Sequence, residues 1–326
     1  FDYAVNYTGK GTVTTVAGGN GQGSNANQLS NPYDITVDPS GNMFIADAYN
    51  ARIQKWTQGA TSGTTVAGGN GSGSSANQLS SSIHGVAIDG SGNIYVVSSA
   101  NNRVQKWASG ASSGTTVAGG NGEGSNANQF YGPRGIALDA SGNIYIADQS
   151  NYRVQKWASG ATSGTTVAGG NGFGSNANQL KTTSAVFIDS SGSLYISDGP
   201  NQRIQKWLFG ASEGITVAGG NGRGSGANQL DYPDGVVVDA GGNVYISDSN
   251  NDRIQKWEPG ATSGTTIAGG NGSGSASNQL NEPYKLCIDN MNNVYIADTK
   301  NHRIQKITNV PQIIISAGQT SATLTI

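Results

Sequence analysis

Residues 135–172 read GIALDASGNIYIADQSNYRVQKWASGATSGTTVAGGNG, which is one copy of a unit that recurs along the chain. Each unit contains four runs of about five residues rich in Val, Ile, Thr and Tyr, separated by Gly, Asn, Asp and Ser, a composition that favours strands joined by turns. The period of 50 or 51 residues with four strands per unit predicts an all-β fold, a six-bladed β-propeller of four-stranded antiparallel blades. The six copies of the string AGGNG begin at Ala17, Ala67, Ala118, Ala168, Ala218 and Ala268.

The two ends of the repeated region complement each other. Thr12–Ala17 form a fourth strand without the preceding three, and Tyr284–Ile307 contain three strands without a following AGGNG. Because an open ring would expose a sheet edge, we expect the N-terminal strand to complete the last blade. Residues 1–307 are therefore predicted to form the propeller. Residues 308–326 break the period and are predicted to be a linker or the start of a following β module.

Three motifs of the repeated unit, the first two with substitutions in most copies, resemble the NHL repeat family over about residues 12–307: P-x-G-[IV]-A-[VL]-D, G-N-[IV]-Y-[IV]-A-D and N-x-R-[IV]-Q-K. The resemblance implies a six-bladed propeller of the extracellular or surface type. Segment 308–326 resembles part of an Ig-like or Calx-β-like module. We therefore expect the chain to be part of a larger multidomain surface protein.

Charge is sparse and balanced. Asp, Glu, Lys and Arg make up 12% of the residues, against about 25% in typical proteins, and the formal net charge is −2. The arginines of N-x-R and the lysines of Q-K recur in every blade, which predicts structural ion pairs and hydrogen bonds between blades. The five tryptophans are likewise expected to pack between blades. Only six basic residues remain, too few for a nucleic-acid surface.

No apolar run reaches the roughly 18 residues of a membrane span, so no membrane-spanning segment is predicted. The chain is rich in Gly, Ser, Thr and Asn and has a single cysteine, Cys287. We interpret this composition as that of a secreted or cell-surface protein, of bacterial origin.

Positions at which the copies differ are those that the shared scaffold does not dictate. Alternating strand directions place these positions on one face, where the loops between second and third strands and the long loops into the next blade lie. The variable residues predicted at the channel mouth are Tyr33, Asp34, His84, Arg134, Ser184, Asp234, Tyr284 and Lys285. Those in the outer loop are Gln22, Glu123, Phe173 and Arg223, with serine in the other two copies.

In a six-membered ring the second and fifth blades face each other, as do the third and sixth. We therefore expect His84 opposite Asp234, and Arg134 opposite Tyr284. A ring that mixes aromatic, cationic and anionic groups suits a small polar ligand, a glycan or a peptide. The predicted function is an extracellular binding or adhesion module for a glycan, peptide or protein ligand. Neutral drift at solvent-exposed positions is the alternative interpretation of the variation.

A propeller enzyme, either a lyase or a hydrolase with its site in the channel, is the less favoured alternative. The resembling family includes a peptide-amidating lyase whose channel holds zinc through histidines. Catalytic zinc needs three convergent protein ligands, and this chain has only two histidines, His84 at the channel mouth and His302 in a more distant loop. For a calcium-dependent hydrolase, Asp34 and Asp234 are the only candidates. We predict no catalytic residues, no metal site and no cofactor.

Overall fold

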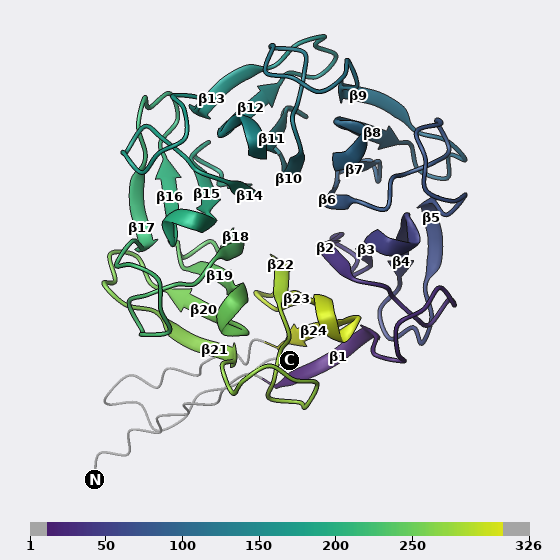
Figure 1. Cartoon of the computed structure of the whole chain (residues 1–326). Coiled ribbons are helices and arrows are strands. Elements are labelled where there is room, and N and C mark those ends of the chain that lie inside the picture. The colour runs from purple at the N-terminus through teal and green to yellow at the C-terminus, as the bar shows by residue number, and fades with distance from the viewer. Residues whose placement is uncertain (1–11, 309–326) are drawn as a thin grey trace, which may run out of the picture.

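A computed structural model describes residues 12–308, which form six four-stranded antiparallel sheets around a central axis (Figure 1). The prediction of an all-β six-bladed propeller is confirmed. The helical content of the described residues is one three-residue 3-10 turn in each blade, between the second and third strands. These turns are η1 (Ala48–Asn50), η2 (Ser99–Asn101), η3 (Gln149–Asn151), η4 (Gly199–Asn201), η5 (Ser249–Asn251) and η6 (Thr299–Asn301).

In each blade the first strand lies nearest the axis and the fourth lies at the outer edge (Figure 1). The first blade contains β2 (Pro32–Val37), β3 (Met43–Asp47), β4 (Arg52–Trp56) and β5 (Thr64–Gly68). The second and third contain β6 (Ile83–Ile88), β7 (Ile94–Ser98), β8 (Arg103–Trp107), β9 (Thr115–Gly119), β10 (Pro133–Leu138), β11 (Ile144–Asp148), β12 (Arg153–Trp157) and β13 (Thr165–Gly169). The fourth and fifth contain β14 (Thr183–Ile188), β15 (Leu194–Asp198), β16 (Arg203–Trp207), β17 (Ile215–Gly219), β18 (Pro233–Val238), β19 (Val244–Asp248), β20 (Arg253–Trp257) and β21 (Thr265–Gly269).

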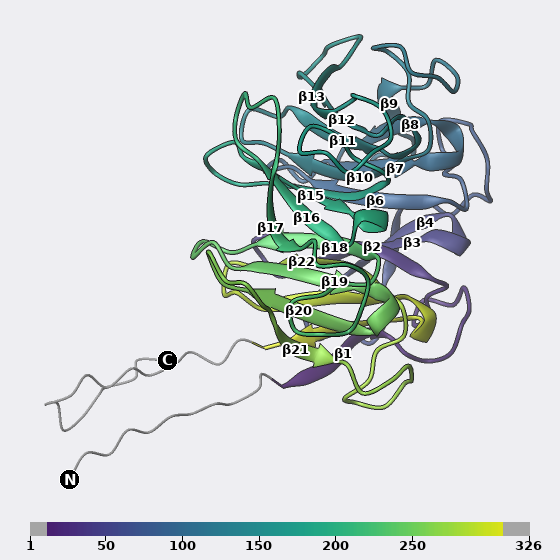
Figure 2. The same ribbon diagram turned by 60° about the vertical axis from the view of Figure 1, so that its left-hand side comes forward.

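The last blade is closed by the N-terminal strand. β1 (Val13–Gly18) pairs antiparallel with β24 (Arg303–Ile307). On its other side β24 pairs with β23 (Val294–Asp298), which pairs with β22 (Pro283–Ile288). Val13 lies opposite Ile307, so the predicted closure is confirmed. Figure 2 shows the ring from a second direction, with β1 at its rim. The segment expected to begin a further β module, apart from Thr308, lies outside the described residues.

Hydrophobic clusters lie between neighbouring blades. Trp107 of the second blade packs with Phe44 and Ile53 of the first, and Trp56 of the first packs with Tyr295 and Ile304 of the sixth. The expectation that the tryptophans serve inter-blade packing is confirmed. A blade cannot bury both of its faces alone, so the closed ring is the unit of stability.

The repeated arginines hold the long inter-blade loops against the blades. Arg52 Nε lies 2.7 Å from Asp47 Oδ2, and its terminal nitrogens donate to the carbonyl oxygens of Ser24, Asn25 and Gln28. The predicted structural role is confirmed in five blades. The equivalent ion pairs are Arg153–Asp148, Arg203–Asp198, Arg253–Asp248 and Arg303–Asp298.

The second blade departs from this pattern because Ser98 replaces the aspartate. Ser98 Oγ accepts hydrogen bonds from the Ser80 amide and the Asn101 side chain, but Arg103 Nε is buried without a partner among residues 12–308. Burial lowers the pKa of Arg103. This blade therefore lacks the carboxylate that the other five blades place beside the arginine.

Candidate functional site

The six variable positions at the channel mouth are equivalent residues of the innermost strands, each the second residue of its strand. Two of their side chains contact the η turns of their own blades: the Tyr33 ring meets that of Tyr49 edge-on with centroids 6.2 Å apart, and His84 Nδ1 lies 2.9 Å from Ser99 Oγ. The channel mouth and the loops between second and third strands therefore lie on the same face, as predicted.

An aromatic cluster fills the mouth on the side of the sixth, first and second blades. The ring of Tyr33 stacks on that of His84, with centroids 4.8 Å apart and an interplanar angle of 13°. The centroid of the Tyr284 ring lies 4.9 Å from that of Tyr33, and the two rings are tilted by 34°. Tyr49, which is 54% exposed, extends the cluster outward. Tyr49 was not among the residues predicted from the sequence, although it is the only aromatic residue at its position among the six turns.

His84 is held as a neutral imidazole. Burial, with the nearby positive charges of Arg134 and Lys285, lowers the pKa of His84 to about 3. Its Nδ1 atom lies within hydrogen-bonding distance of the hydroxyls of Ser99 and Ser82. His84 and Asp234 belong to the second and fifth blades, which face each other as expected, but no hydrogen bond or ion pair joins these two described residues. The imidazole instead stacks on Tyr33 and contacts serines of its own blade.

Arg134 crosses the channel mouth. Its Nη1 donates a hydrogen bond to the hydroxyl of Tyr284, so the expected pairing of the third and sixth blades is confirmed. Burial, followed by the charge of Asp234, raises the pKa of Tyr284, which keeps the phenol protonated. Burial and the Tyr49 hydroxyl raise the pKa of Tyr33 to about 12.

The residues that directly follow Tyr33 and Tyr284 in the sequence form a buried ion pair, Asp34 with Lys285. Through its further hydrogen bonds this pair connects the first strands of four blades. Lys285 Nζ lies 3.6 Å from Asp34 Oδ2 and donates to the carbonyl oxygens of His84 and Arg134. Asp34 in turn accepts the amide hydrogen of Val86 at 2.9 Å. Both charged groups have protein partners, so we assign Asp34 and Lys285 a structural role: they hold the first strands that carry Tyr33, His84, Arg134 and Tyr284. The equivalent residues in the other blades are Gly85, Gly135, Ala185 and Gly235.

Asp234 and Ser184 complete the ring on the fifth and fourth blades. Both are buried, with exposed fractions of 4% and 1%. Burial raises the pKa of Asp234 to about 6, and the nearby hydroxyl of Ser184 and the charge of Arg134 offset part of the rise. The mouth is therefore packed and mostly buried, which differs from the solvent-exposed ring that the neutral-drift interpretation requires.

The outer-loop residues do not converge with the mouth. Gln22 Nε2 donates to Ser30 Oγ at 3.0 Å, and Arg223 pairs with Asp231 of its own blade at 2.9 Å. Phe173 is exposed and meets Tyr152 edge-on at 5.3 Å. Glu123 is exposed on the third blade. Each of these residues contacts only its own neighbourhood, so the set does not define one site.

No group of three or more His, Cys, Asp or Glu residues suited to a metal ion occurs within residues 12–308. His302 lies at the end of η6, where its Nδ1 accepts the amide hydrogen of Asn31 at 3.2 Å. This hydrogen bond joins the sixth blade to the loop that leads into the first blade. No helix in the described region is long and apolar enough to cross a membrane.

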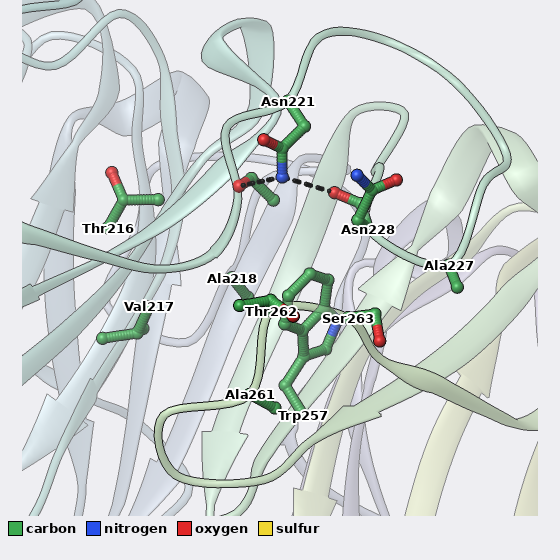
Figure 3. A pocket seen from close by; sticks show the side chains of 11 residues that line it. Thr216, Val217, Ala218, Asn221, Ala227, Asn228, Trp257, Ala261, Thr262 and Ser263 are labelled. Carbon is green, nitrogen blue, oxygen red and sulfur yellow. Dashed lines mark hydrogen bonds between the residues drawn. The ribbon is translucent and has the colours of Figure 1, made fainter.

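Two cavities lie away from the channel. One of about 490 Å³ lies between β17 and the loop that joins β20 to β21, and is lined by Asn221, Asn228, Trp257 and Thr262 among others (Figure 3). A second of about 440 Å³ in the third blade is lined by Ser125, Arg153 and other residues. Most of these residues recur in every blade, which marks both hollows as features of the scaffold.

Comparison with known proteins supports the repeat assignment. The NHL repeat matches residues 130–157, 230–257 and 280–307, and a beta-propeller repeat matches residues 75–103. The protein is a six-bladed β-propeller that carries NHL repeats. No curated protein gives a significant match.

Several solved structures share the fold. An auxiliary nutrient binding protein from Bacteroides ovatus is 15% identical with a TM-score of 0.65, and the match covers 91% of this chain and 76% of the other. A putative gluconolactonase is 14% identical with a TM-score of 0.61, covering 91% and 92%. Virginiamycin B lyase from Staphylococcus aureus is 13% identical with a TM-score of 0.54, covering 91% and 98%. At these identities the similarity establishes the fold alone.

Proposed function

We propose that this protein is a binding module, secreted or displayed on a bacterial surface as part of a larger protein, that recognises a glycan or peptide at the channel mouth. One observation carries the proposal: the mouth is filled by an aromatic and cationic cluster that the scaffold does not require. Its members are Tyr33, Tyr49, His84, Arg134 and Tyr284, and at each of these positions most other blades carry a different residue type.

The cluster offers ring faces and hydrogen-bonding groups together. Tyr49 is exposed, while Tyr33, Arg134 and Tyr284 are half-buried at the same mouth. Amphipathic rings beside a small number of fixed polar groups are the usual composition of a ligand site. Because its cross-channel contacts fix the cluster in place, binding requires little further ordering of these side chains.

Proteins of this fold include both binders and enzymes. A similar structure from Bacteroides ovatus is described as a nutrient binding protein, whereas others are described as a lyase and a putative gluconolactonase. One observation favours an enzyme as the second candidate: the pKa of Asp234 is raised by burial to about 6, which suits a general acid or base near neutral pH.

The test is binding of the full chain to glycan and peptide arrays. We expect binding to a restricted set of glycans or peptides, lost in Tyr49→Ala and retained in Phe209→Ala. Phe209 is the matched control because it is 78% exposed in the loop between the third and fourth strands, on the opposite face. Absence of binding on both arrays, or binding that depends on Phe209 and not on Tyr49, would overturn the proposal. Chemical conversion of the bound molecule, detected by mass spectrometry, would replace it with the enzyme alternative.

A further inference from the structure

One carboxylate in each of five blades occupies a point where three hydrogen-bond donors converge. In the first blade it belongs to Asp47. Its donors are the amide of Ser30 at 2.6 Å, Nδ2 of Asn50 at 2.8 Å and Nε of Arg52 at 2.7 Å. The third to sixth blades repeat the arrangement around Asp148, Asp198, Asp248 and Asp298. The scaffold therefore contains a recurrent position for a negative charge.

The second blade keeps the three donors and replaces the carboxylate by the hydroxyl of Ser98. The Ser80 amide and Asn101 Nδ2 donate to this hydroxyl at 3.2 and 3.0 Å. Arg103 Nε is buried and has no acceptor among residues 12–308. A serine is shorter than an aspartate and carries no charge, so no ion pair balances the arginine in this part of the described structure. A cation that is partly removed from water without an anion is unfavourable.

The Arg103 guanidinium is also held less firmly than its equivalents. The terminal nitrogens of Arg52 donate to three loop carbonyl oxygens. Within the described part of the chain, Arg103 makes one hydrogen bond, from Nη2 to the carbonyl oxygen of Ser75 at 3.2 Å. Arg103 is half-buried, whereas the five equivalent arginines are buried. Its guanidinium is thus both short of partners and closer to solvent.

A hollow in the third blade shows the side from which such an arginine is reached. This hollow, of about 440 Å³, borders both Asn151 and Arg153. The second blade carries the same residue types at all seven equivalent positions, which are Ser74, Asn101, Arg103, Thr116, Gly119, Gly120 and Asn121. We therefore expect a small ion to reach Arg103 from the same side.

Charge and size favour a small monovalent anion at this point. Because serine differs from aspartate by little more than the carboxylate group, the position suits an ion of about that size and no larger. One negative charge balances the single positive charge of the guanidinium. Hydrogen bonds from a guanidinium to an anion are roughly twice as strong as those between neutral groups, which favours an anion over a water molecule.

We propose that the second blade binds a small monovalent anion, such as chloride or formate, at the position that an aspartate carboxylate takes in the other five blades. Arg103 Nε, Asn101 Nδ2 and the Ser98 hydroxyl, which can rotate to donate, are its ligands. The anion joins β7, η2 and β8. It thereby supports the turn whose Ser99 hydroxyl lies 2.9 Å from His84 Nδ1 at the channel mouth.

The test is thermal unfolding of the full chain at constant ionic strength, with sodium chloride replacing sodium methanesulfonate, whose anion is larger. Chloride should raise the melting temperature of the wild type in a saturable way, by about 2–3 °C at a concentration tenfold above its Kd. Formate should act in the same way. Ser98→Asp supplies its own carboxylate, so its melting temperature should not respond to either anion.

Two further variants separate this site from a general effect of salt. Ser109→Asp adds the same charge at an exposed position of the same blade and should respond to chloride as the wild type does. Asp148→Ser reproduces the second-blade arrangement in the third blade and should respond more strongly than the wild type. Equal chloride responses in the wild type and Ser98→Asp, loss of the response in Ser109→Asp, or no response in the wild type would each overturn the proposal.

A measurement on the wild type alone does not depend on the folding of any variant. Crystals of the full chain soaked in bromide should show an anomalous scattering peak beside Arg103 Nε. Bromide peaks confined to other places would show that the second blade does not bind the ion, and would overturn the proposal.

Discussion

Arg134 in the third blade donates a hydrogen bond to the hydroxyl of Tyr284 in the sixth, and so ties opposite sides of the ring together at its mouth. The two residues are 150 positions apart in the sequence. Because a hydrogen bond between a charged donor and a buried phenol is among the stronger kinds, this contact helps to fix the mouth in one arrangement.

This contact predicts energetic coupling between the two side chains. Tyr284→Phe and Arg134→Met should each lower the free energy of unfolding, and their effects should fall short of additivity by about 1–2 kcal/mol in a double-mutant cycle measured by urea unfolding. Tyr131→Phe, the same chemical change at an exposed tyrosine, should change stability by less than about 0.5 kcal/mol. Strict additivity of the first pair would show that the bond does not form in solution.

His84 should make the protein less stable in acid. Its pKa is about 3 when folded against 6.5 for the ordinary group, so the unfolded chain binds the extra proton between these values. The resulting stability is present above pH 6.5 and is lost by about 1.4 kcal/mol for each pH unit below it. His84→Asn should therefore lose less stability than the wild type between pH 7 and pH 5. The neighbouring groups Arg134, Lys285 and Asp234 are common to both proteins, so parallel profiles would contradict the assignment.

Ser98→Asp should stabilise the second blade. The substitution restores the carboxylate that pairs with arginine in the other five blades, and it gives buried Arg103 Nε an acceptor. We expect an increase of about 1–2 kcal/mol in the free energy of unfolding at pH 7, as for a charge-assisted hydrogen bond. Ser109→Asp adds the same charge at an exposed loop of this blade and should have little effect. A loss of stability in Ser98→Asp would mean that this blade has repacked around the serine.

Removal of residues 1–17 should lower the melting temperature markedly. β1 pairs with β24 from Val13 to Gly18, and Ala17 is buried between the blades. Without this strand the last blade keeps three strands and exposes the edge of β24. Removal of residues 1–11, which leaves β1 complete, is the matched control. Equal melting curves for the two truncated proteins would show that closure contributes nothing.

The sequence by itself was sufficient to predict the architecture. The repeat period, the four strand-like runs and the incomplete first and last units predicted six blades and closure by the N-terminal strand. The tryptophans and most of the N-x-R arginines were also assigned correctly, because a residue that recurs in nearly every blade serves a contact that nearly every blade makes. These features depend on local pattern and on neighbouring blades.

Only the tertiary structure decided which contacts are made by the residues that differ between the blades. The alternating strand directions placed His84 and Arg134 on the face that carries the loops between second and third strands. They could not show that His84 stacks on Tyr33 or that Tyr49 joins the cluster. Nor could it show that Lys285 reaches Asp34 and the carbonyl oxygens of two other blades. The reason is physical: side-chain length and rotamer decide which neighbour is reached inside a packed channel, and the burial that shifts the pKa of His84 and Asp234 exists only once the ring has closed.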